Sequence, residues 1–380
     1  MKRSSERVLT THAGSLPRPP DLLELAQTGG SPARFAARVR SAVSSVVRKQ
    51  ADVGLDVITD GEMSKPSFIT YVTERLSGFT RSADPGTLPW GGSKEVTAFP
   101  EFYEPSLRQS PNAAAPRYEC TGPVTYVGHA HVQVDVANLK SALAGLDVTE
   151  AFLPAIAPSN VEGRQRNAHY TTDEEYLFAI AEAMHEEYKA IVDAGLLLQI
   201  DDPRLVTYYI MSPTSTVAEC RRWAEVRVEA LNHALRGLPR DRVRFHTCYS
   251  INMGPRVHDM QLKDIVDVIL KVNAGAYSFE AANPRHEHEW RVWEGVTLPD
   301  DAVLIPGVIT QSTVLVEHPE LVAERIQKFA SVVGREHVIA GADCGFASFA
   351  GSTEIHSSVV WAKLQSLVDG ARIASQRLWR

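Results

Sequence analysis

The sequence predicts an α/β fold of the (β/α)8 TIM-barrel class, with an inserted hairpin or lid region. Short apolar runs rich in β-branched residues alternate with longer segments of helical periodicity, which is typical of a parallel sheet with crossover helices. Eight such units fit the 380 residues of the chain. No Gly-x-Gly-x-x-Gly motif follows the first strand, so a barrel is favoured over a doubly wound sheet.

The expected strands are short apolar runs, and several of them end in polar residues. In chain order they cover residues 8–13, 55–59, 121–127, 196–200, 243–248, 276–280, 303–309 and 338–342. Continuous apolar runs of this length are typical of strands that are buried on both faces of a parallel sheet.

The expected helices carry apolar residues at three- and four-residue spacing. They cover residues 35–52, 173–194, 216–235, 262–272, 319–333 and 353–378. Val39 and Val43 lie on one stripe of the first segment, and Tyr176, Ile180 and Met184 lie on one stripe of the second. Such a stripe faces the core when a helix covers a sheet.

Residues 81–116 interrupt this alternation. The segment is rich in Pro, Gly, Ser and aromatic residues and is too long for a simple connection. It is interpreted either as a surface excursion or dimer contact, or as a lid or hairpin over the barrel mouth. A shorter irregular stretch, 154–167, is expected to have a similar part, and residues 1–380 are interpreted as one domain.

The composition is that of a soluble globular protein, with 44% hydrophobic and 22% charged residues. A net charge of −7 without a long basic block argues against nucleic acid or an anionic membrane as the main partner. The four cysteines are widely spaced, and the first seven residues contain no apolar segment. We therefore expect a reducing cytoplasm. The sequence does not determine the oligomeric state, and a homo-oligomer is possible.

A metal-binding pattern lies at the end of the strand expected over 243–248. Side chains two residues apart on a strand point the same way, so His246 and Cys248 can grip one ion. A further cysteine, Cys344, follows the last expected strand. One imidazole and two thiolates favour zinc, which keeps one position open in catalytic sites. The alternative interpretation is core packing, since free cysteine is often buried.

Other strand ends also finish in ionisable residues, which is where barrel enzymes collect their catalytic groups. They include Glu62, Asp201, Glu280 and Asp343. Glu280 is a candidate fourth zinc ligand that leaves when a substrate thiol arrives, and its alternative is a partner of Arg285 or His246. The run 285–289 contains two histidines but is interpreted as a solvated loop.

These motifs together resemble the catalytic barrel of cobalamin-independent methionine synthase and its single-barrel relatives, which include epoxyalkane:coenzyme M transferase. The similarity extends from about Leu9 to Leu378 through motifs at residues 11–17, 60–62, 122–125, 199–203, 246–248, 277–280 and 342–345. The resemblance implies a zinc cofactor held by His246, Cys248, Glu280 and Cys344. It also implies that the amino-acid part of homocysteine is bound by Ala13, Gly14, Ser15, Glu62 and Asp201.

Two features depart from the methionine synthase pattern. The synthase has a second, N-terminal barrel that helps to hold its polyglutamylated folate, and these 380 residues leave no room for one. The synthase also has a proton-handling histidine after its seventh strand, whereas residues 307–313 contain none. The zinc-activated thiol is therefore supported better than the identity of the alkyl donor.

The function implied is a zinc-dependent thiol alkyltransferase, most simply methyl transfer to homocysteine giving methionine. The alternatives are an epoxide-opening thiol transferase and a non-catalytic zinc- and thiol-binding barrel. The partners would be a small-molecule thiol and a methyl or alkyl donor. An acid must protonate the leaving group, and His12 is the catalytic candidate by its position, followed by Asp343 and Tyr249 as poorer candidates.

Overall fold

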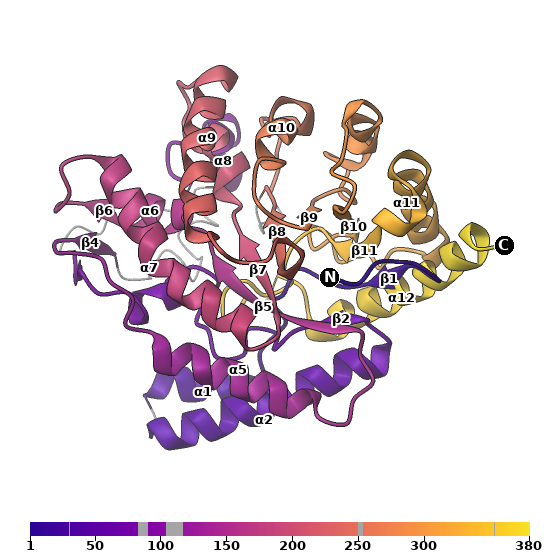
Figure 1. Ribbon diagram of the computed structural model, residues 1–380, viewed down its shortest axis with the longest axis horizontal. Helices are drawn as coiled ribbons and strands as arrows, with labels where there is room; N and C mark the ends of the chain where they lie inside the picture. Colours follow the sequence, from indigo (N-terminus) through magenta and orange to yellow (C-terminus); the bar gives the residue numbers. More distant parts are fainter. Residues whose placement is uncertain (30, 83–89, 104–116, 250–253, 353) are drawn as a thin grey trace.

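The computed structural model describes residues 1–29, 31–82, 90–103, 117–249, 254–352 and 354–380. Eight parallel strands form a nearly closed barrel in the order β1-β11-β10-β9-β8-β7-β5-β2 (Figure 1). Their bounds are β1 Leu9–Thr10, β2 Val57–Ile58, β5 Glu150–Ile156, β7 Leu197–Asp201, β8 Val243–Thr247, β9 Ala276–Phe279, β10 Val303–Ile309 and β11 Ile339–Ala342. The predicted (β/α)8 barrel is therefore confirmed.

The seam between β1 and β2 is held by the residue that precedes β2. The backbone N–H of Thr10 donates to Asp56 Oδ2 at 2.8 Å, and Asp56 N–H donates to the Thr10 carbonyl at 3.1 Å. Thr11 Oγ1 also donates to the Val57 carbonyl at 2.9 Å. A buried carboxylate that accepts backbone N–H groups thus replaces part of the missing strand ladder.

Helices surround the strands on the outside of the barrel (Figure 1). The bounds of the helices, including α3 of the inserted region, are α1 Pro20–Thr28, α2 Pro32–Val53, α3 Lys94–Ala98, α5 His129–Leu143, α6 Pro158–Arg164, α7 Asp173–Asp193, α8 Arg204–Met211, α9 Val217–Ala234, α10 Val266–Ile269, α11 Pro319–Val333 and α12 Ser357–Leu378. Short 3-10 segments cover Thr70–Glu74, Arg240–Arg242, Leu262–Asp264, Glu287–Gly295 and Arg335–His337. The predicted helix over 262–272 is much shorter in the structure, where it is reduced to a 3-10 turn and the single turn of α10.

Two of the predicted helices begin at capping boxes that the sequence contains. Thr172 accepts from the N–H of Glu175, whose side chain returns to the Thr172 N–H, and α7 starts there. Thr216 and Glu219 make the same pair of contacts at the start of α9. Each box satisfies N–H groups that the first helical turn leaves without a partner.

The third predicted barrel strand, over 121–127, is wrong. The nearby strand β4 (Tyr118–Cys120) lies outside the barrel, antiparallel to β3 (Phe79–Arg81) and parallel to β6 (Arg166–Asn167). The true third strand is β5, and it reaches into the stretch that was expected to be irregular. Pro154 lies within β5 opposite Gln199, and a proline in a short run usually argues against a strand.

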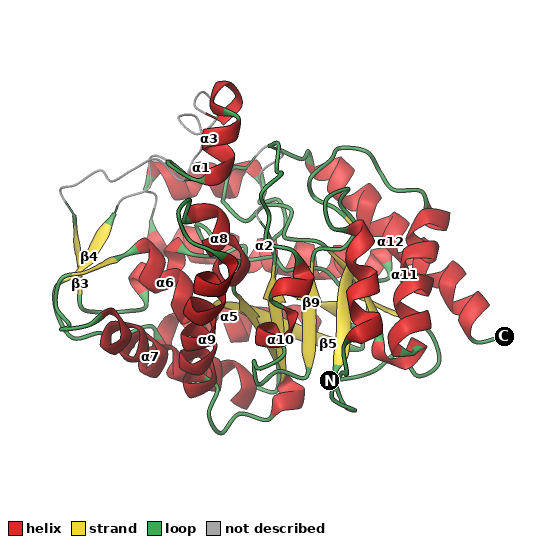
Figure 2. Ribbon diagram, turned by 90° about the horizontal axis from the view of Figure 1, so that it is seen from above, coloured by secondary structure: helices red, strands yellow, loops and turns green. Residues whose placement is uncertain are grey.

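The inserted region begins and ends as a hairpin, because β3 and β4 pair on either side of it. Residues 83–89 and 104–116 of this prediction lie outside the described residues. Between them, α3 is tied to the segment after β8, where Glu95 Oε1 accepts from the N–H groups of Val257 (2.8 Å) and His258 (2.6 Å). Figure 2 shows α3 at the end of the barrel opposite the N-terminus.

Apolar residues fill the amino-terminal end of the barrel. One cluster joins Leu9, Ala276, Val303, Ile305 and Ile339, and another joins Val57, Phe152 and Leu197. Most of these residues are the first in their strands. The polar residues that follow the strands therefore gather at the opposite, carboxyl-terminal end, as in other barrels of this class.

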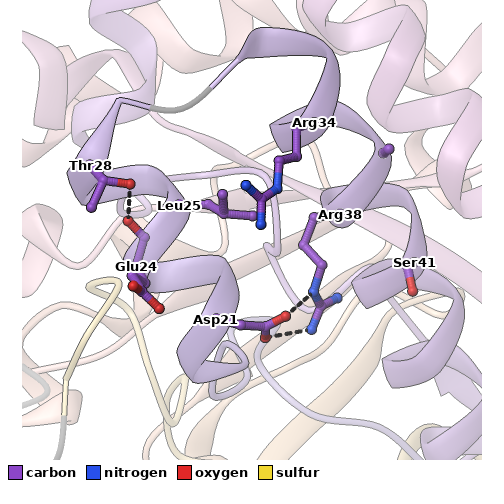
Figure 3. Close-up of a pocket in the computed structure, with 8 residues that line it drawn as sticks. Asp21, Glu24, Leu25, Thr28, Arg34, Arg38 and Ser41 are labelled. Atoms are coloured by element: carbon purple, nitrogen blue, oxygen red, sulfur yellow. Dashed lines mark hydrogen bonds and ion pairs between the residues drawn. The ribbon is translucent and has the colours of Figure 1, made fainter.

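A shallow pocket lies outside the barrel between α1 and α2 (Figure 3). Its volume is about 460 Å3, and it is lined by Asp21, Glu24, Leu25, Thr28, Arg34, Ala37, Arg38 and Ser41. Arg38 Nε and Asp21 Oδ2 form an ion pair across it at 2.6 Å. None of the predicted site residues lines this pocket.

Candidate metal centre

Three buried side chains converge at the carboxyl ends of β8 and β11. The ligand atoms of His246, Cys248 and Cys344 all lie within 4.8 Å of one another. Cys248 Sγ and Cys344 Sγ are 3.1 Å apart, although 96 residues separate them in the chain. His246 lies on β8, Cys248 follows that strand directly, and Cys344 lies two residues beyond β11. The predicted three-residue cluster is thus assembled.

The donor set fits a zinc ion. Burial, followed by the nearby Arg244 charge, lowers the pKa of His246 to about 3, so the imidazole is neutral as a metal ligand must be. Its Nδ1 is hydrogen-bonded to Ser278 Oγ at 3.1 Å, which orients the ring and leaves Nε2 for an ion. The hydrogen bond to Cys344, followed by burial, raises the pKa of Cys248. A divalent cation would release those thiol protons.

Glu280, the predicted fourth ligand, follows β9 and does not belong to the three-residue cluster. Its Oε2 pairs with Arg256 Nη2 at 3.2 Å and accepts from Asn283 Nδ2 at 2.7 Å. Its Oε1 accepts from the N–H of Tyr249, the residue after Cys248, at 2.8 Å. Arg285, which was predicted as an alternative partner of Glu280, pairs with Asp259 instead, at 3.4 Å.

The residues predicted to bind an amino-acid head meet at the ends of β1, β2 and β7. Gln199 Nε2 donates to the Ala13 carbonyl at 2.6 Å and to Asp201 Oδ1 at 2.7 Å. A Cβ built on Gly14 would lie 3.7 Å from both Gln199 Nε2 and Glu62 Oε1. These are ordinary contact distances, and it is the φ of +127° at Gly14 that favours a glycine there.

Glu62 and Asp201 are both buried carboxylates. Burial raises the pKa of each, and the Glu62 charge adds to the rise at Asp201. Arg18 Nη2 is 3.6 Å from Glu62 Oε2, but that oxygen accepts no hydrogen bond among the described residues. Glu62 also has a φ of 58°, a conformation that costs free energy in a residue with a Cβ. A buried carboxylate with a strained backbone and an oxygen that lacks a hydrogen-bond donor is typical of a binding site.

Ser15 lies at the edge of this group. Its Oγ is 3.3 Å from Ser348 Oγ, and its carbonyl accepts from the Phe346 N–H at 3.0 Å. Ser15 therefore ties the loop after β1 to the segment that follows Cys344. The predicted binding segment and the predicted metal ligand are neighbours through these contacts.

The two predicted catalytic residues have engaged side chains. His12 Nε2 is hydrogen-bonded to Gln50 Oε1 at 2.8 Å, and its Nδ1 accepts from the Gly14 N–H at 3.2 Å. Burial lowers its pKa to about 4. Asp343 Oδ1 accepts from the N–H groups of Ala281 (2.7 Å) and Ala282 (2.8 Å). These contacts fix the loops after β1 and β9, and the catalytic role of both residues stays a prediction.

A family comparison identifies the chain. The family model described as "Cobalamin-independent synthase, Catalytic domain" matches residues 8–114 and 157–372, which is most of the sequence. The chain belongs to the cobalamin-independent methionine synthase family. It is by membership a transferase of the methyltransferase type, and the resemblance inferred from the motifs is confirmed.

Relatives and solved structures agree with that family. A methionine synthase from Thermococcus kodakarensis is 25% identical, covering 98% of this chain and 94% of its own, and one from Sulfolobus acidocaldarius is 26% identical, covering 97% and 93%. The structure of a B12-independent methionine synthase from a Shewanella species, in complex with selenomethionine, superposes with a TM-score of 0.74. It has 19% identity and covers 98% and 99% of the two chains, and it supports the fold.

Several polar residues of this site were not predicted from the sequence. Gln199 lies two residues before Asp201 on one strand, so the alternation of side chains could have identified it. Arg256 has no such signal. Within 285–289, Arg285 and His288 are exposed, as expected for a solvated loop. His286 is instead buried between Asp259 (3.2 Å) and Glu289 (2.8 Å) and stacks on Tyr249.

Proposed function

We propose that this chain transfers a methyl group to the sulfur of homocysteine, giving methionine, with zinc as its cofactor. The observation that carries the proposal is the buried His246, Cys248 and Cys344 cluster at the mouth of a barrel of the cobalamin-independent synthase family. The relatives at 25% and 26% identity that cover nearly the whole chain are named methionine synthase.

His246, Cys248 and Cys344 would hold the zinc ion, and Glu280 would be its exchangeable fourth ligand. The chemistry that zinc supplies when bound is activation of a thiol, which it converts to a thiolate at neutral pH and holds in place. The chain's residues fix this site in advance, because Ser278 orients His246 and the strand ends bring both cysteines together.

The acid pair supports an amino-acid head on the thiol substrate. The Glu62 and Asp201 carboxylates have raised pKa values because they are buried without enough positive charge. An ammonium group placed between them would remove that penalty. Ser15 Oγ and backbone N–H groups of the loop after β1 suit the substrate carboxylate. A barrel that only stored metal would have no need of such an acid pair.

Methyl donor binding is proposed at the barrel mouth beneath the inserted region. Glu95 fixes α3 to the segment after β8, and Tyr103 Oη donates to the Pro255 carbonyl at 2.6 Å. Phe102 exposes about half of its side chain beside this contact, offering an aromatic surface for a flat donor. We also propose a cytoplasmic location, since all four cysteines are free and buried. No described helix is long and apolar enough to cross a membrane.

The Glu62→Gln substitution tests the substrate. We expect the zinc-loaded variant to bind homocysteine roughly ten- to a hundredfold more weakly by calorimetry, because a buried ammonium loses one charged hydrogen-bond partner. Coenzyme M has a sulfonate and no ammonium group, so its weaker affinity should not change. Tighter zinc-dependent binding of coenzyme M than of homocysteine by the unmodified protein would instead favour the epoxide-opening alternative.

The Glu95→Ala substitution tests the inserted region. We expect turnover to fall because α3 loses both hydrogen bonds to the segment after β8, while zinc content and homocysteine affinity stay unchanged. The control is Glu101→Ala, which removes an exposed carboxylate just beyond α3. Equal steady-state turnover in the two variants would make the insertion a structural feature only.

A further inference from the structure

Glu280 is held by a dedicated set of donors beside the metal ligands. Arg256 Nη2 lies 3.2 Å from its Oε2, Asn283 Nδ2 donates to the same oxygen at 2.7 Å, and the Tyr249 N–H donates to Oε1 at 2.8 Å. Glu280 and Arg256 are both buried. Each carboxylate oxygen therefore has a partner without any contribution from a metal.

The donors that hold Glu280 lie close to the proposed metal ligands because chain neighbours of both cysteines contact them. Tyr249 directly follows Cys248, so the residue that holds Glu280 Oε1 is adjacent to a proposed ligand. Asn283 also donates to Asp343 Oδ2 at 3.3 Å, and Asp343 directly precedes Cys344. Cys248 is thus connected to Glu280 through Tyr249, and Cys344 is connected to it through Asp343 and Asn283.

We propose that Arg256 is a positioning residue that receives the Glu280 carboxylate when a substrate thiol takes its place on the metal. This inference rests on the proposed function and assigns the carboxylate two resting places, on the ion or on Arg256. With zinc held by His246, Cys248 and Cys344, one anionic ligand, the carboxylate, would leave as another, the thiolate, arrives, and the thiol proton would pass to bulk water. The charge at the metal centre is then the same before and after the exchange.

The burial of the Glu280 carboxylate explains why it needs a positively charged partner when it leaves the metal. A carboxylate that leaves a cation inside a protein must find a new partner, because an unpaired buried charge is strongly destabilising. Arg256 provides that partner with a planar guanidinium that no other described acid engages at hydrogen-bond distance. Its Nη1 makes no hydrogen bond among the described residues, so the guanidinium retains donor capacity for a rearranged carboxylate.

The test compares Arg256→Met with Arg285→Met. Arg285 is a more exposed arginine that pairs with Asp259 and the Val257 carbonyl and not with Glu280, so it is the control. We expect Arg256→Met to bind homocysteine at least about thirtyfold more weakly in the zinc-loaded state, because the departing carboxylate loses its partner. Without thiol, its zinc affinity, measured against a chromophoric chelator, should increase.

Two further variants separate this role from a purely structural one. Arg256→Lys should recover part of the homocysteine affinity, since it restores a cation. In a Glu280→Gln background, Arg256→Met should have no additional effect on either affinity. X-ray absorption of the zinc-loaded Arg256→Met protein, at a homocysteine concentration that just saturates the unmodified protein, should show an oxygen ligand retained where the unmodified protein gains a sulfur.

The outcomes divide clearly between the two proposals. If the unmodified protein binds zinc and homocysteine, and Arg256→Met matches Arg285→Met in both affinities, the receptor role is overturned and the proposed function stands. An unmodified protein that binds no zinc overturns both. An equal effect of Arg256→Met with and without the Glu280 carboxylate shows that the residue acts on something else.

Discussion

Replacing Cys344 by Ser is expected to weaken zinc binding by more than about a hundredfold and to abolish methyl transfer. Loss of a supporting contact already costs a metal site about ten- to a hundredfold, and a direct thiolate ligand contributes more. Cys344 lies 3.1 Å from Cys248 and reaches the site from the far end of the chain. Zinc content after purification, measured by elemental analysis, and homocysteine affinity with added zinc provide the readouts.

The matched control for this prediction is Cys220→Ser. Cys220 is also a free, buried cysteine, but it lies on α9 and is not part of the metal cluster. We expect it to retain one zinc per chain. A purified Cys344→Ser protein with stoichiometric zinc would show that the proposed ligand set is wrong.

The second large effect is expected on stability, from Glu187→Gln on α7. Glu187 is fully buried, pairs with Arg75 Nη1 at 3.0 Å, and accepts from Tyr71 Oη (2.9 Å) and Tyr126 Oη (2.7 Å). In the variant Arg75 keeps Asp135 as its remaining acid partner, while two buried tyrosine hydroxyls lose a charged acceptor, so the free energy of unfolding should fall by about 3 kcal/mol. Denaturant titration measures it.

The pH dependence of stability follows from the same carboxylate. Burial alone would raise the pKa of Glu187, but the charges of Arg75 and Lys65 and the two tyrosine hydroxyls lower it below its ordinary value. The folded state therefore binds that proton less readily than the unfolded state does. The stabilisation is fully present above the ordinary glutamate pKa and is lost as the pH falls through the lowered one.

A control on the same helix is Glu182→Gln. Glu182 is largely exposed and pairs with Arg236 and His233 at the surface. Exposed pairs contribute about 1 kcal/mol or less, so we expect little change. If Glu182→Gln and Glu187→Gln destabilise the protein equally, the buried network around Glu187 does not stabilise the fold more than a surface ion pair does.

The sequence by itself determined the barrel and much of its polar end. The alternation of apolar runs and helical stripes identified seven of the eight barrel strands. These seven are β1, β2 and β7–β11. The pattern failed at β5 because Pro154 within that strand and an apolar run over 121–127, before α5, gave misleading local signals. Local patterns report periodicity, whereas strand pairing depends on residues far away in the chain.

The proposed zinc ligands His246, Cys248 and Cys344 could be found from residue type and strand position, because a barrel brings all strand ends to one rim. Only the tertiary structure decided what each carboxylate touches. Glu280 rests on Arg256, and His12 is held by Gln50. Neither pairing has a sequence signature, because the partners come from separate loops whose packing alone sets their distance.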